Sequence, residues 1–418
     1  RTGRCTASAR AGACAPVDTG CSIGKAAQRF RRLAGGDNLP PMTKPALTAL
    51  FALVLLGCVP KEAQVATPPS STTVATTPKA SPPAEAAPEK VAQPPVDLAP
   101  VPFEAARANF VRDTSARYGI PAAQIEATLA RANFLDSVVT AMSRPAERVK
   151  PWHEYRPMFI TQARIDGGRA FMAQNREALE RVQARTGVPA ELIVSIIGVE
   201  TSYGRNTGKY SVLDALYTLA FRYPRSGDPA RLEREVRREL FFRDELAQLF
   251  ALGREEKLDI TALKGSYAGA MGLGQFMPSS YRQFAVDGDG DGRRDLFGSL
   301  DDVFASVANY FVKKGGWVPG APVAVPATLA AGREPFNPED WTPNHGLDAL
   351  AARGYTPQQP LPAGIGATPV SLEGADGPQY WLGFQNYYAI TRYNISKMYA
   401  MAVYQLSQAI AGHGIPPA

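Results

Sequence analysis

The stretch that decides the fold is Ile193–Gly204 (IVSIIGVETSYG), an apolar run that ends in one carboxylate and a glycine. In a helix, Glu200 shares one stripe with three isoleucines, at the i, i+3, i+4, i+7 spacing that faces a core. These isoleucines are Ile193, Ile196 and Ile197. Burial disfavours the charged form of a carboxyl group, so the pKa of Glu200 is expected to rise from about 4.3 towards roughly 6–7. A carboxyl group that keeps its proton at neutral pH is the general acid that cleavage of a glycosidic bond requires.

The composition indicates a folded chain and gives no electrostatic reason for a nucleic-acid partner. The 418 residues are 45% hydrophobic and 20% charged, which is enough chain for two or three domains with their own cores. The net charge of +6 lies in residues 1–57, which carry eight Lys or Arg and two Asp or Glu. Of the totals of 45 and 39, residues 58–418 carry 37 basic and 37 acidic residues. The body of the chain is therefore neutral, and we expect it to bind no nucleic acid.

The segment that follows Met42 has the features of a bacterial lipoprotein signal. Residues 45–56 are apolar, and residues 55–58 (LLGC) resemble a lipobox that ends in Cys58. A transmembrane anchor is the alternative, but about 11 apolar residues fall short of the roughly 20 that span a bilayer. We expect residues 42–57 to be removed and Cys58 to be acylated, which holds the protein on a membrane leaflet. Val59 follows the cysteine, and in Gram-negative lipoproteins a residue other than Asp indicates the outer membrane, with the protein facing the periplasm.

Two further segments near the N-terminus are not expected to fold. Residues 59–100 contain ten prolines and no aromatic residue, so this part of the 58–100 segment cannot bury a core. As a linker it could extend up to about 130 Å, at roughly 3.1 Å per residue. Residues 1–41 contain three of the four cysteines and no methionine, and we interpret them as an over-extended gene start.

The remaining sequence predicts a mostly helical α+β protein. Helical patterns cover residues 105–110, 125–134, 168–186, 232–249 and 397–410. Short β-prone stretches between Pro and Gly predict a small β-rich subdomain at residues 318–386. We therefore expect a helical region and core at 101–317, this subdomain, and a C-terminal helix within 387–418 that returns to the core.

A second informative segment is Gly265–Pro278 (GSYAGAMGLGQFMP). Its glycines let the backbone approach another group closely, and Gln275 offers a donor and an acceptor of the kind that reads sugar hydroxyls or N-acetyl groups. The glycine spacing does not fit a dinucleotide-binding GxGxxG loop, and no Lys-Ser or Lys-Thr follows as in a P-loop. A tight structural turn is the alternative interpretation.

Together with a third segment, these two stretches resemble the lytic murein transglycosylases, specifically the membrane-bound B type. The motifs are residues 198–204 (GVETSYG), 265–281 (GSYAGAMGLGQFMPSSY), and 391–394 (TRYN) followed by 399–403 (YAMAV). The resemblance covers roughly residues 101–415. It implies a lysozyme-like helical core in an enzyme that cuts the β-1,4 bond between N-acetylmuramic acid (MurNAc) and N-acetylglucosamine (GlcNAc) of peptidoglycan. These enzymes close a 1,6-anhydro ring on MurNAc instead of adding water.

The resemblance also implies a one-carboxylate mechanism and a set of cleft residues. Glu200 would protonate the leaving oxygen and then take the proton of the MurNAc C6 hydroxyl group as it attacks the anomeric carbon. In the family's mechanism the substrate's N-acetyl group helps to stabilise positive charge at that carbon, and no organic cofactor is needed. The implied cleft residues are Ser266, Gln275, Tyr393, Asn394 and Tyr399, with Tyr155 and Arg225 at more distant sugar or peptide contacts. Packing of a tyrosine ring into the core is the alternative for each tyrosine.

Residues 287–295 (DGDGDGRRD) have the 1, 3, 5 carboxylate spacing and the position-6 glycine of an EF-hand calcium loop. Gly298 stands where the closing bidentate glutamate is expected. In the resembled family the loop is longer, which makes a later aspartate the closing ligand and adds a backbone carbonyl. The predicted ligands of a structural Ca²⁺ are Asp287, Asp289, Asp291, the Arg293 carbonyl and Asp301. A solvated Asp-Gly turn is the alternative, and the three scattered histidines predict no zinc site.

Two other functions compete with the lytic transglycosylase. A peptidoglycan hydrolase would use water and a second carboxylate, for which Asp214 is the nearest candidate downstream of Glu200. A non-catalytic, calcium-dependent wall-binding lipoprotein would be expected to lack the buried glutamate. The expected partners are peptidoglycan strands and, through the lipid anchor, the outer membrane, and complexes of cell-wall synthesis or division are further candidates.

Overall fold

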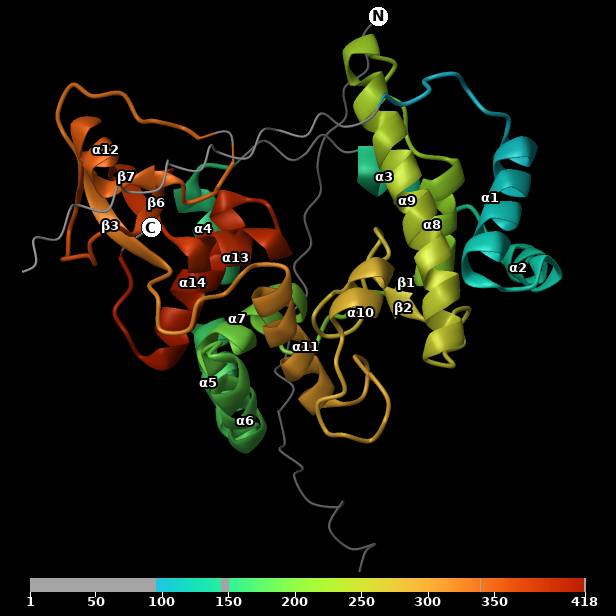
Figure 1. The fold of residues 1–418 in the computed structure, drawn as a ribbon, viewed down its shortest axis with the longest axis horizontal. Coiled ribbons are helices and arrows are strands. Elements are labelled where there is room, and N and C mark those ends of the chain that lie inside the picture. Colours follow the sequence, from blue (N-terminus) through green and yellow to red (C-terminus); the bar gives the residue numbers. More distant parts are fainter. Residues whose placement is uncertain (1–94, 144–149, 339, 417–418) are drawn as a thin grey trace, which may run out of the picture. The chain divides into compact units, whose positions relative to one another are not determined.

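The computed structural model describes residues 95–143, 150–338 and 340–416. The predictions for residues 1–41, the lipoprotein signal, Cys58 and most of the linker fall outside these described residues. Within them the chain is mostly helical with two small sheets, so the predicted α+β class is confirmed (Figure 1). The first six helices are α1 Phe103–Tyr118, α2 Ala122–Leu129, α3 Asp136–Ser143, α4 Trp152–Phe159, α5 Gln162–Gln174 and α6 Arg176–Thr186.

Helix α7, Ala190–Thr201, carries the stretch that decides the fold. It begins directly after Pro189, as its sequence pattern suggests, because the fixed φ of proline suits a helix start. Nearly every side chain of α7 is buried, and the helix packs against α5, α6, α11 and α14. A helix that is apolar on all sides belongs inside a core, so α7 is the central helix of its neighbourhood.

The remaining helices surround this core or extend from it. They are α8 Val212–Phe221, α9 Pro229–Glu255, α10 Pro278–Phe284, α11 Leu300–Lys313, α12 Leu347–Ala352, α13 Gln385–Tyr393 and α14 Lys397–Ala411. The long helix α9 packs against α8 and α10, and α14 packs against α4, α5, α7 and α13. The last helix of the chain therefore returns to the central helix.

Two helix predictions have the wrong extent. The single helix predicted at 168–186 is two helices, because the chain breaks at Asn175, whose φ is −116°. The Asn175 side chain donates to the Phe171 carbonyl at 2.8 Å, and such a local bond competes with helix propagation. The helix predicted at 125–134 already ends at Leu129.

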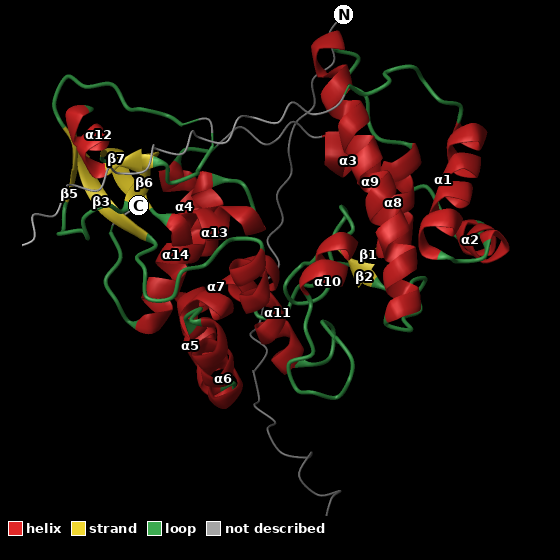
Figure 2. Ribbon diagram, in the orientation of Figure 1, coloured by secondary structure: helices red, strands yellow, loops and turns green. Residues whose placement is uncertain are grey.

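The β-rich segment forms a five-stranded antiparallel sheet in the order β4-β6-β7-β3-β5 (Figure 2). Its strands are β3 Ala324–Leu329, β4 His345–Gly346, β5 Tyr355–Pro357, β6 Gly366–Gly374 and β7 Gly377–Gly383. The sheet has its own apolar cluster, which includes Val325, Leu350, Tyr355 and Leu382. Two further short strands, β1 Tyr210–Ser211 and β2 Lys264–Gly265, pair with each other beside the glycine-rich segment.

No single helix of the described residues is long and apolar enough to cross a membrane. Helices α6 and α7 together have the length and composition, but they bend by 114° at their junction.

Candidate active site

Glu200 lies in the last turn of α7, and its carboxyl group is surrounded by protein atoms. Burial raises the pKa of Glu200 to about 7. The O–H group of Tyr399 donates to Glu200 Oε1 at 2.5 Å, and this bond opposes the rise because it favours the charged form. No charged side chain of the described residues adds to the shift of this pKa. The site therefore presents one carboxyl group in an apolar environment, close to half protonated at neutral pH.

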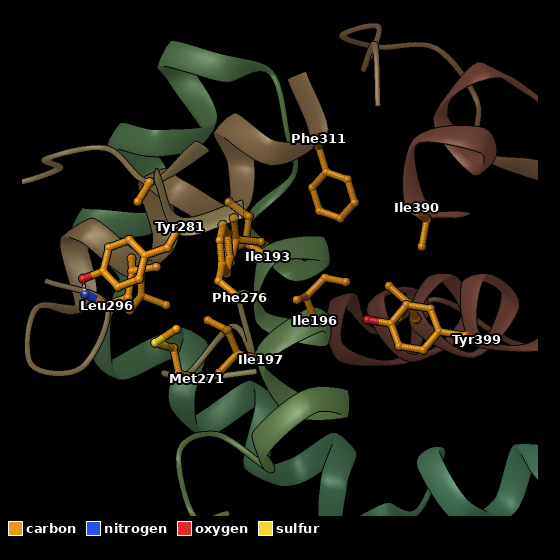
Figure 3. Packing of buried hydrophobic residues seen from close by; sticks show 14 of the residues in the cluster. Ile193, Ile196, Ile197, Met271, Phe276, Tyr281, Leu296, Phe311, Ile390 and Tyr399 are labelled. Carbon is orange, nitrogen blue, oxygen red and sulfur yellow. Dashed lines mark hydrogen bonds between the residues drawn. The ribbon is translucent and has the colours of Figure 1, made fainter. Parts of the chain in front are cut away.

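Tyr399 reaches Glu200 from α14, which is separated from α7 by most of the folded chain. Its ring points towards Ile196 of α7 in Figure 3. The Ser396 side chain caps α14 by accepting from the Tyr399 amide at 3.4 Å, which fixes the start of the helix. Burial and the charge of Glu200 raise the pKa of Tyr399 well above its usual value. Tyr399 therefore keeps its proton at neutral pH and acts as a hydrogen-bond donor to Glu200.

The chain leaves α7 through three consecutive residues with positive φ, which are Ser202 (51°), Tyr203 (61°) and Gly204 (83°). The left-handed region is unfavourable for residues other than glycine, so this turn requires support from its surroundings. Tyr203 supplies it by folding back under the helix, where its O–H group donates to the Arg164 carbonyl at 2.7 Å. A Cβ atom at Gly198 would lie 2.7 Å from the Tyr203 ring, so only glycine allows this close approach.

Thr201 is a residue of the site that the sequence analysis missed. Its side chain is buried, and its hydroxyl group accepts from the Gly204 amide at 3.1 Å. The same hydroxyl group lies within donating distance of two carbonyls, that of Leu273 at 3.0 Å and that of Ile197 at 3.1 Å. This hydroxyl group joins the end of α7 to the glycine-rich segment. Its position next to Glu200 was the only available signal, because the partner lies 72 residues further along the chain.

The glycine-rich segment is held by its own side chains. Ser266 Oγ accepts from the Ala270 amide at 3.0 Å, and Gln275 donates to the carbonyls of Gly272 at 2.9 Å and Thr207 at 3.1 Å. Gln275 itself has a positive φ of 52°. Both predicted cleft residues thus stabilise the loop, and their contact with substrate stays a prediction.

Three of the predicted tyrosines gather around the carboxyl group of Glu200. The charge of Glu200 raises the pKa of Tyr155 on α4, Tyr393 on α13 and Tyr399 on α14, in each case after the larger effect of burial. The Tyr393 O–H group donates to the Gly274 carbonyl at 2.6 Å, which ties α13 to the glycine-rich segment. Asn394 follows directly, is exposed, and accepts from the Ser396 amide at 3.2 Å.

Two other residues named from the sequence have partners of their own. Arg225 pairs with Glu239 of α9, and its guanidinium lies 5.8 Å from the centroid of the Tyr223 ring. Asp214, the candidate second carboxylate, accepts from the Asn133 amide at 2.9 Å in the first turn of α8.

The acidic loop between α10 and α11 gathers three carboxyl groups whose oxygen atoms lie within 4.8 Å of one another. They belong to Asp287, Asp289 and Asp302. Hard oxygen donors at this spacing suit a calcium ion. The predicted closing residue Asp301 instead pairs with Arg181 at 2.7 Å, and its buried neighbour Asp302 faces the cluster. Asp291 accepts from the Arg293 amide at 2.8 Å and does not belong to the cluster.

Comparisons with known proteins agree with this fold. The family model for the transglycosylase SLT domain matches residues 102–408. Membrane-bound lytic murein transglycosylase B of Escherichia coli K12 is 44% identical over 312 residues, which cover 72% of this chain and 82% of that protein. The crystal structure of E. coli lytic transglycosylase Slt35 in complex with calcium has a TM-score of 0.64 and 43% identity, and the match covers 73% of this chain and 92% of that one.

A third relative carries a ligand. SltB3 from Pseudomonas aeruginosa, in complex with NAG-anhNAM-pentapeptide, is 32% identical with a TM-score of 0.63, covering 75% of this chain and 80% of that one. The fold and these relatives thus define a lytic transglycosylase. The chain belongs to the family of membrane-bound lytic murein transglycosylase B.

Proposed function

We propose that this chain cleaves the β-1,4 bond between MurNAc and GlcNAc of peptidoglycan and leaves a 1,6-anhydro end, with Glu200 as the only acid and base. The observation that carries the proposal is the buried carboxyl group of Glu200, whose pKa is raised to about 7. A group that titrates near neutral pH can donate a proton in one step and accept one in the next.

The proton balance of this reaction needs no second carboxylate. The proton of Glu200 moves to the glycosidic oxygen as the bond from that oxygen to the anomeric carbon breaks. The MurNAc C6 oxygen then bonds to the anomeric carbon, and its proton returns to Glu200. Tyr399 holds the carboxyl group in place through both steps by donating to Oε1.

The structure offers little support for the hydrolase alternative. Asp214 is engaged by the Asn133 amide. Glu245 is also buried, but it accepts from both the amide and the hydroxyl group of Ser279 and so caps α10. Neither contributes to the pKa of Glu200.

Mass spectrometry of muropeptides released from purified peptidoglycan tests the proposal. Products lighter by one water than the reducing species support it, whereas reducing products would establish a hydrolase. Glu200→Gln should abolish release, while Glu180→Gln, which removes an exposed carboxylate from α6, should retain it. Release by a folded Glu200→Gln protein would refute the role of this residue, and no release by the unaltered chain would favour the wall-binding alternative.

We also propose a structural Ca²⁺ in the acidic loop. The three clustered carboxyl groups of Asp287, Asp289 and Asp302 would supply the charge, and the predicted ligands Asp291, Asp301 and the Arg293 carbonyl remain candidates for completing the coordination. The relative Slt35 was crystallised in complex with calcium. Such an ion would tie α10 to α11 and would take no part in the chemistry.

The proposed location is the periplasmic face of the outer membrane, with Cys58 as the lipid anchor. The support is the lipobox-like sequence together with the membrane-bound relative. Metabolic labelling with a radioactive fatty acid should mark the unaltered chain and not the Cys58→Ala variant. Equal labelling of both would contradict this assignment.

A further inference from the structure

A cavity of about 770 Å³ lies where the start of α4, the β6–β7 hairpin and the start of α14 meet. Its volume is in the range of sites that bind small molecules or short peptides. The lining combines aromatic rings with charged groups. The aromatic residues are Trp152, Trp341 and Tyr380, and the charged residues are Lys150, Glu373 and Lys397. Nothing in the one-carboxylate reaction uses this cavity.

The charge of the lining favours an anion. Lys397 is the first residue of α14, so its ammonium group adds to the positive end of a 15-residue helix. Its Nζ donates to the Ser371 carbonyl at 2.6 Å, which leaves two of its three N–H donors for a ligand. Burial lowers the pKa of Lys397, and a partly desolvated cation attracts an anion more strongly than one in water. Lys150 adds a second positive charge, against the single exposed carboxylate of Glu373.

Two polar atoms in the wall of the cavity also have no hydrogen-bond partner in the described part of the chain. They are Trp152 Nε1, on a fully buried side chain, and Ser371 Oγ. Both atoms are inaccessible to solvent, so they belong to the packed wall behind the cavity, and the case for a ligand rests on the charge and the aromatic rings of the lining.

The cavity adjoins the catalytic site without sharing its carboxyl group. Met398 lines the cavity, and the next residue, Tyr399, donates to Glu200. On α4, Trp152 lines the cavity. Tyr155 lies less than one turn later, and burial and then the charge of Glu200 raise its pKa. Lys397 does not contribute to the pKa of Glu200. The rings of Trp152 and Tyr155 stack with centroids 6.3 Å apart, so one aromatic pair separates the cavity from the surroundings of Glu200.

We propose that this cavity binds a carboxylate of the peptide that the glycan strand carries. This inference rests on the proposed function, because it concerns the same substrate. N-acetylated sugars are neutral and give the lysines no charge to pair with, whereas the peptide supplies carboxylate groups. The aromatic rings of Trp341 and Tyr380 provide an apolar wall for the rest of the peptide.

Calorimetric titration of the full chain with free stem pentapeptide tests the proposal. The titration uses the Glu200→Gln protein, so binding is measured without turnover. Adding Lys397→Met should weaken binding about tenfold, because it removes a charge-assisted hydrogen bond. Adding Glu373→Gln should strengthen binding, because it removes the negative charge from the lining of the cavity. Lys313→Met, which removes an exposed lysine from α11, is the matched control and should leave the affinity unchanged.

Lys397→Met and Glu373→Gln are expected to change the affinity in opposite directions, so a general loss of structure cannot produce both results. Glu373 is exposed, so its substitution serves even where Lys397→Met weakens the fold. Equal affinities in all variants, or full competition by a neutral GlcNAc oligomer, would overturn the proposal. These results are independent of the proposed function, which fails only when intact protein releases reducing products or when Glu200→Gln still cleaves.

Discussion

Glu200→Gln should stabilise the folded protein at neutral and alkaline pH while abolishing its activity. The pKa of Glu200 is raised from 4.5 to about 7 by burial, so the folded state holds a proton that the unfolded state releases. Below pH 4.5 both states are protonated, and the carboxyl group has no effect on the free energy of unfolding. Between pH 4.5 and 7 the free energy of unfolding falls as the pH rises, and above pH 7 the full cost is present.

The expected size follows from the shift. Each unit of pKa difference corresponds to about 1.36 kcal/mol, so the ionised carboxylate costs about 3 kcal/mol above pH 7. Glutamine has nearly the same shape, carries no charge, and still accepts from the Tyr399 O–H group. For a folded part of roughly 300 residues, a gain of this size raises the melting temperature by about 5 °C.

Thermal unfolding of both proteins at pH 4, 6 and 8 measures the effect. The glutamine variant should match the unaltered protein at pH 4 and exceed it increasingly at pH 6 and 8. Glu180→Gln controls for the loss of one negative charge at an exposed position and should show no gain of this size. A gain that is the same at pH 4 and pH 8, or a variant that is less stable at pH 8, would refute the burial of an ionisable group at this position.

Three further predictions follow from contacts of the site. Tyr399→Phe removes a hydrogen bond that lowers the pKa of Glu200. The midpoint of the alkaline limb of the pH–rate profile, expected near pH 7 in the unaltered protein, should therefore shift to higher pH. An unchanged midpoint would contradict this contact. Thr201→Val should lower kcat about tenfold with little change in KM, because it frees the catalytic helix from the Leu273 carbonyl, and Thr201→Ser should restore it. Calcium should raise the melting temperature of the unaltered protein and not of Asp287→Asn, and a melting temperature indifferent to calcium would count against the site.

Local spacing was sufficient to predict the catalytic helix and the class of the fold. The stripe of isoleucines that includes Glu200 indicated a buried carboxyl group, and the helix start at Pro189 follows from proline geometry. The β-prone stretches that flank Pro and Gly correspond to β3 and β6 of the sheet. These features depend on residues a few positions apart, which is the range over which a sequence pattern carries information.

Contacts between distant segments could not be predicted in this way. The bond from Thr201 to Leu273 and the orientation of Asp301 depend on where other segments pack. Arg181 on α6 pairs with Asp301, while the amides of Gly288 and Asp295 hold the carboxyl group of Asp302 beside the other two aspartates. Likewise, the hydrogen bonds of Ser266 and Gln275 to the backbone could not be predicted from the sequence, and the contact of both residues with substrate stays a prediction. The break at Asn175 was missed because one side chain that bonds its own backbone overrides a periodic pattern.

The bond between Tyr399 and Glu200 joins residues 199 positions apart, and Tyr399 lies in the last helix of the described chain. Because a chain is made from its N-terminus, the carboxyl group exists long before its hydrogen-bond donor does. A chain cut off before residue 397 would carry the acid without the helix that holds it. A shortened product that has lost this helix should therefore keep Glu200 but lack the donor that orients its carboxyl group.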